Sequence, residues 1–114
     1  MSQVPNSEPQ VLSTAGAITP TRINFLLSTS SPPAALALTL AAPTVDGSEY
    51  NFISQDTQTH TLTCTGAGSP PTAGLNGGTT NNRLTWNGTK GSSVTLTSYN
   101  GFWYSSAING VTVS

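Results

Sequence analysis

The chain has 114 residues, a formal net charge of −1, and charged side chains at only 6 % of its positions. A typical soluble domain carries about 25 % charged residues, and Ser and Thr take their place here. The length predicts one domain, and the absence of a net positive charge argues against nucleic-acid binding. No apolar run is long enough to span a membrane, and the N-terminus shows no secretory signal pattern.

Residues 1–16 predict an extended N-terminal arm. Pro5 and Pro9 favour extended backbone, and the rest of the segment is mostly polar. One interpretation is a disordered tail, as is common at chain ends. The other is an arm that becomes ordered against a neighbouring subunit, with Val4, Val11 and Leu12 as its apolar anchors.

From residue 17 onward the pattern is that of β-strands. Apolar and polar residues alternate with a period of two, which places each set on one face of a sheet. The predicted strands lie within residues 18–28, 35–40, 49–54, 60–65, 84–86, 94–97, 102–105 and 111–113. No stretch has the periodicity of a good amphipathic helix.

Turn signals separate these strands. Asn-Gly pairs occur at residues 76–77, 87–88, 100–101 and 109–110, and they suit the positive φ angles of tight turns. The pair at 100–101 is the strongest hairpin signal, and residues 66–82 predict a long surface loop. We therefore expect an all-β fold, an antiparallel β-sandwich or small jelly-roll-like barrel over residues 17–114 with the arm over residues 1–16.

Residues suited to catalysis are few. His60 needs a partner to act as a base, and Asp56 is the nearest carboxylate in sequence. The pattern instead favours a solvent-facing strand position for His60. Cys64 shares a face with Leu62 and is expected to be a small buried apolar residue rather than a nucleophile.

Two further kinds of active site are weakly supported. Asp46, Glu49 and Asp56 could supply the acid and base of a glycosidase, but the chain has only four acidic residues. No zinc, calcium-loop or phosphate-loop spacing is present. We expect no catalytic residues, no metal and no cofactor. Residues 87–89 match a glycosylation acceptor but are more simply a turn.

Aromatic residues concentrate in the last third of the chain. Phe102 and Tyr104 share one strand face and Trp103 takes the other, so at least one face presents an aromatic to solvent or to a partner. Exposed Trp and Tyr rings stack on sugars or anchor protein interfaces. Trp86, Trp103 and Tyr104 are therefore the candidate interface aromatics.

Five short segments carry a resemblance to a known group of proteins. They are residues 16–18 (GAI), 36–40 (LALTL), 46–47 (DG), 91–96 (GSSVTL) and 101–104 (GFWY). Together they resemble small β-rich modules of tailed-bacteriophage virions, over roughly residues 16–114. Ser92 stands where those modules often have Asp.

The resemblance implies one of two structural roles. The first is a capsid decoration (cement) protein, non-enzymatic and often trimeric, that sits on the capsid exterior after synthesis in the host cytoplasm. Its partners would be the major capsid protein and other copies of itself, with Val4, Pro5, Pro9, Val11 and Leu12 as the capsid-contact arm. The alternative is a tail-fibre or tail-tip module that binds a host glycan or surface protein. The short chain favours the decoration protein.

Overall fold

The computed structural model describes residues 9–28, 34–66, 72–77 and 81–114. In these residues the only regular secondary structure is β-strand, and there is no helix. The strands are β1 (Gln10–Leu12), β2 (Gly16–Ala17), β3 (Asn24–Leu27), β4 (Ala37–Leu40), β5 (Glu49–Ser54), β6 (Thr61–Gly66), β7 (Thr72–Ala73), β8 (Arg83–Trp86), β9 (Ser93–Tyr99), β10 (Phe102–Asn109) and β11 (Val111–Val113).

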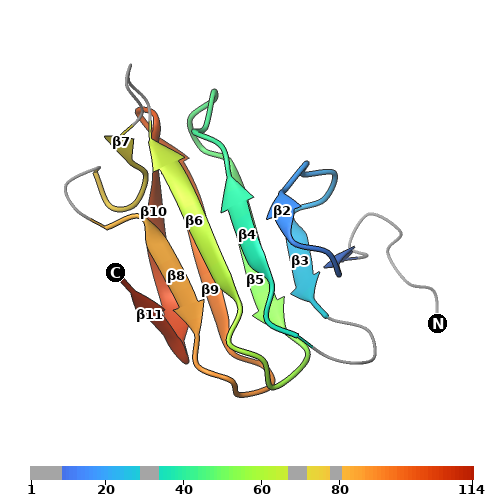
Figure 1. Cartoon of the computed structure of the whole chain (residues 1–114). Helices are drawn as coiled ribbons and strands as arrows, with labels where there is room; N and C mark the ends of the chain where they lie inside the picture. Colours follow the sequence, from blue (N-terminus) through green and yellow to red (C-terminus); the bar gives the residue numbers. More distant parts are fainter. Residues whose placement is uncertain (1–8, 29–33, 67–71, 78–80) are drawn as a thin grey trace.

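The strands form two sheets that face each other (Figure 1). The first sheet has the order β1-β3-β5-β9-β10, and the second has the order β11-β8-β6-β4-β2, with β7 pairing to β6. The predicted all-β sandwich is confirmed. The alternation of apolar residues with Thr or Ser explains it, because each strand can bury one face and leave the other in water.

The sheets are mixed, whereas the sequence suggested antiparallel pairing. From β1 to β6 the chain alternates between the sheets, so that β1, β3 and β5 are parallel neighbours, as are β2, β4 and β6. Each visit to the opposite sheet returns the chain in its original direction. The intervening strand of the opposite sheet, with the loops on either side of it, therefore serves as the crossover connection that parallel strands require.

The last third of the chain is antiparallel. Residues 100–101 join β9 to β10 with φ angles of 52° and 86°, which confirms the predicted two-residue hairpin. The register shifts between Ser106 and Asn109, where Ala107 has a φ of 48°. Gly110, with a φ of 70°, then carries the chain from the first sheet into β11 of the second.

The core lies between the inner faces of the two sheets. Its largest fully buried members are Trp86, Phe25, Phe52 and a set of leucines. Phe25 stacks on Phe52 with ring centroids 4.7 Å apart, and Phe52 meets Trp86 edge-on at 6.4 Å. These aromatic contacts join the parallel and antiparallel parts into one core.

Part of the segment predicted as an N-terminal arm belongs to the two sheets. Residues 10–12 and 16–17 form β1 and β2, which pair with β3 and β4, and Leu12 is buried in the core. The boundary predicted at residue 16 is therefore wrong, because the apolar side chain of Leu12 completes the domain's own core. Val4 and Pro5 lie outside the described residues.

The predicted loop over residues 66–82 also differs from a simple surface loop. Leu75 in this segment is fully buried and forms a parallel bridge with Trp103. One large apolar side chain is thus enough to tie part of the segment to the core.

Candidate functional site

The two tryptophans are part of the core. Trp86 is fully buried and its Nε1 donates to the carbonyl of Ser92 at 3.0 Å. Trp103 is also buried, and its Nε1 donates to the carbonyl of Ala41 at 3.0 Å. The prediction that both are interface aromatics is wrong, because each ring fills the core and each indole N–H bonds within the chain.

Tyr104 is exposed, as expected, and it has an aromatic neighbour. Tyr99, on the other strand of the hairpin, is 62 % exposed, and the two ring centroids are 6.4 Å apart. Strand alternation correctly predicted that Tyr104 and Trp103 face opposite ways. It could not indicate which of these faces was the inner one.

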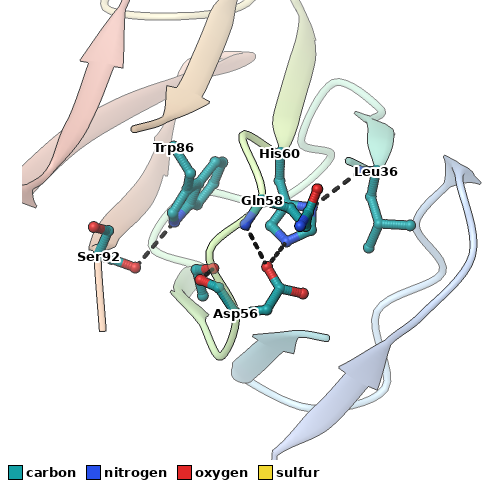
Figure 2. A network of polar contacts seen from close by, with 7 residues as sticks. Leu36, Asp56, Gln58, His60, Trp86 and Ser92 are labelled. Carbon is teal, nitrogen blue, oxygen red and sulfur yellow. Dashed lines mark hydrogen bonds and ion pairs between the residues drawn. The ribbon is translucent and has the colours of Figure 1, made fainter. Parts of the chain in front are cut away.

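His60 is buried, so its predicted solvent-facing position is wrong. The backbone N–H of Leu36 donates to Nδ1 of His60 at 2.9 Å, and Nε2 lies 2.7 Å from Oδ1 of Asp56 (Figure 2). Because Nδ1 accepts a hydrogen bond, the neutral ring carries its proton on Nε2 and donates it to Asp56. Both ring nitrogens are therefore engaged inside the protein.

Asp56 holds the turn that precedes His60. Its Oδ1 also accepts the backbone N–H of Gln58 at 2.9 Å (Figure 2). Its carbonyl accepts the hydroxyl of Ser54 at 3.1 Å. Such local side-chain bonds are typical of Asp in turns. The carbonyl of His60 accepts the N–H of Trp86 at 2.8 Å, which ties this turn to the next strand. In the sequence, Asp56 is the nearest carboxylate to His60. In the structure the two side chains are hydrogen-bonded, and their role is to stabilise the fold.

The acidic residues proposed for a glycosidase site are far apart. Glu49 begins β5, whereas Asp56 follows the other end of that strand. At roughly 3.3 Å per residue, the strand alone separates them by about 17 Å, beyond the separation of about 5–9.5 Å that glycosidases use. Asp46 accepts the backbone N–H of Asn100 at 2.8 Å and so supports the β9–β10 hairpin.

Cys64 is buried in the core, which confirms its predicted placement. Desolvation by burial raises the pKa of its thiol from 9.0 to about 12. The thiol stays neutral at physiological pH. It therefore behaves as a small apolar residue and not as a nucleophile.

An apolar row crosses the outer face of the first sheet. Val11, Leu26 and Ile53 are aligned by the register of β1, β3 and β5, and Val11 and Ile53 are 55 % and 41 % exposed. Neighbouring strands are about 4.8 Å apart, so the row spans about 10 Å. Of the predicted arm residues, Val11 thus lies on a solvent-exposed sheet face. Pro9, two residues earlier in the chain, is also exposed.

A polar row runs next to the apolar one. Nδ2 of Asn51 donates to Oδ1 of Asn24 at 2.9 Å, and the hydroxyl of Thr95 donates to Oδ1 of Asn51 at 2.7 Å. These side chains satisfy one another across β3, β5 and β9 without any charge. The row could therefore meet another protein with little loss of hydrogen bonding. We call this outer surface, with the apolar row and the polar row, the sheet face.

The comparisons with known proteins add no identity. No family model matches the chain, and no curated protein sequence matches it.

In the part of the chain that the structure describes, no three His, Cys, Asp or Glu side chains gather into a candidate metal site. The same residues contain no helix of the length and hydrophobicity that a membrane span needs.

Proposed function

We propose that this protein is a non-enzymatic structural protein of a bacteriophage virion, a decoration protein that binds the outer surface of the capsid as a trimer. The observation that carries the proposal is the sheet face, where Val11, Leu26 and Ile53 lie in register beside an uncharged polar row. The resemblance to virion modules supplies the setting.

The physical character of the sheet face suits docking on a repeating protein shell. Apolar area and self-satisfied amides can be buried without stranding a charge. A single contact of this size is weak, since stable interfaces bury well over 1,000 Å² in total. A trimer would present three such faces at once and gain affinity by multivalency.

The residues with catalytic potential support a structural role. His60 has both ring nitrogens occupied, and Asp56 accepts from both His60 and the turn. The ring of His60 therefore has no free nitrogen from which to activate a nucleophile or a water molecule. Their geometry supports proposing a binding protein rather than a hydrolase.

Binding to undecorated heads tests this proposal. The protein should bind them saturably and raise the temperature at which they release their contents. Ile53→Asp places a charge in the apolar row and should weaken binding at least about tenfold. Thr39→Asp places the same charge on an exposed position of β4, in the second sheet and away from the sheet face, and is the matched control. Equal binding by both variants would contradict the role of the sheet face.

The exposed tyrosine pair favours a second candidate function. Tyr99 and Tyr104 present two adjacent rings at the β9–β10 hairpin, and such rings stack on the apolar faces of sugars. This surface fits a tail-tip module that binds a host glycan. A glycan array separates the two functions, because specific binding that is lost in Tyr99→Ala and Tyr104→Ala would favour the tail-tip module.

A further inference from the structure

A small pocket opens between the β2–β3 connection, the β4–β5 connection and the start of β10. Its volume is about 160 Å³, and none of its lining residues is charged. Its walls include Ile18, Pro20, Pro43, Val45, Tyr50 and Trp103. An apolar cavity of about 150 Å³ holds a molecule of benzene. The pocket therefore has room for one branched or ring-shaped apolar group.

The walls of the pocket combine aromatic and aliphatic side chains with the polar residues Thr44 and Ser48. The rings of Tyr50 and Trp103 lie 5.3 Å apart and tilted by 37°, which gives the pocket an aromatic side. The indole N–H of Trp103 is already bonded to the carbonyl of Ala41, so it does not offer a hydrogen bond to a ligand. Val45 on the rim is 66 % exposed. Shape and apolar contact, and not charge, would decide what binds.

Gln10 fixes the point from which the N-terminal segment leaves the domain. Its Nε2 donates to the carbonyl of Thr19 at 3.0 Å, and its Oε1 accepts the backbone N–H and the hydroxyl of Thr21 at 2.8 and 3.0 Å. Thr19 and Thr21 flank Pro20, which is a wall of the pocket. The segment that precedes Gln10 therefore begins beside the pocket.

We propose that the pocket receives Val4 and Pro5 of a second copy of this chain. Val4 is the one branched apolar residue in the sequence of residues 1–9, and the proline after it favours extended backbone at Val4. Six residues of extended chain reach up to about 20 Å from Gln10. This reach is long enough for the segment of one copy to enter the pocket of an adjoining copy.

This exchange of segments would hold the copies of the proposed trimer together. Each copy donates one segment and accepts another, and such a head-to-tail contact forms a closed ring when its rotation closes. The inference rests on the self-association in the proposed function, but it needs no capsid. Val4 and Pro5 thus have the neighbouring copy as their partner, whereas Val11 remains on the sheet face.

A disulfide trap between two single variants of the full chain tests the inference directly. The introduced thiols are Val4→Cys and Val45→Cys; Val45 is an exposed lining residue of the pocket, and the native Cys64 is buried and does not compete. The two proteins are mixed under mild oxidation and analysed on a non-reducing gel. We expect a linked dimer to form at least about tenfold faster than in a mixture of Val4→Cys with Ile108→Cys. Ile108 is an exposed residue on β10 that does not line the pocket.

Two results would overturn the inference. Equal rates in the two mixtures would show that Val4 has no preference for the pocket. A chain that carries both Val4→Cys and Val45→Cys, and that closes only an internal disulfide, would show that the pocket takes its own segment. Neither result bears on the sheet face, since no capsid is present, so this test and the Ile53→Asp test can fail independently.

Discussion

Replacing His60 by Ala should destabilise the fold strongly, because the ring is a structural link. The change leaves the buried N–H of Leu36 without its acceptor, which costs about 1–3 kcal/mol. The lost ring leaves a cavity that costs a further 2–3 kcal/mol or so. The total of roughly 3–6 kcal/mol is a large part of the roughly 6–17 kcal/mol expected for a domain of this length. The melting temperature should fall by roughly 10–25 °C.

Thermal and urea unfolding of a matched series separate the two hydrogen bonds of His60. In His60→Asn the carboxamide oxygen can take the place of Nδ1 and keep the bond from Leu36. In His60→Gln the amide nitrogen can take the place of Nε2 and keep the bond to Asp56. Both should be more stable than His60→Ala. If His60→Ala unfolds within about 1 kcal/mol of the unchanged protein, the structural role of the ring is refuted.

Four further predictions concern the core, a turn and strand β1. Cys64 should resist alkylation in the native protein at pH 8 and react once the chain is unfolded in urea; native labelling at the unfolded rate would contradict its burial. Between pH 9 and about 12 only the unfolded chain releases the thiol proton, so the free energy of unfolding should fall with rising pH, and Cys64→Ala should remove this part of the fall. Gly110→Ala should lower stability by about 1–3 kcal/mol in urea unfolding, because φ is 70° and a Cβ would collide with Ser92, whereas an unchanged midpoint would refute the strain. Deleting residues 2–12 should lower the melting temperature more than deleting residues 2–8, because only the longer deletion removes the buried Leu12; equal melting temperatures would show that β1 is dispensable.

The sequence predicted the strands well because their side chains alternate with a period of two. The expected strands over residues 49–54 and 111–113 coincide with β5 and β11, and the pair at residues 100–101 makes the expected hairpin. These features depend on neighbours in sequence, which is why they could be read from it. Thr and Ser on the outer positions also agree with the exposed or half-exposed faces of β6 and β9.

Strand pairing and the direction of the core could not be predicted in the same way. The pair at residues 87–88 has the same turn signal as that at 100–101, yet it connects strands of different sheets. The parallel neighbours β3 and β5 are joined through a strand of the other sheet, so their register depends on distant contacts. The burial of Trp103 and His60 likewise depends on which sheet lies opposite them.

The pocket and the sheet face were missed for a related reason. Val11, Leu26 and Ile53 are separated in sequence and meet only through the register of β1, β3 and β5. Pro20 and Val45 come from two connections and Trp103 from β10, and they meet only in the folded chain. The outward position of Ile53 between two inward residues was the one local signal available.

A cryo-EM reconstruction of undecorated phage heads incubated with the purified protein tests the central proposal most directly. The proposal predicts trimeric density on the outer surface of the shell, with β1, β3 and β5 of each copy turned towards the capsid protein. Heads without added density, or density in which this sheet face points to solvent, would contradict it.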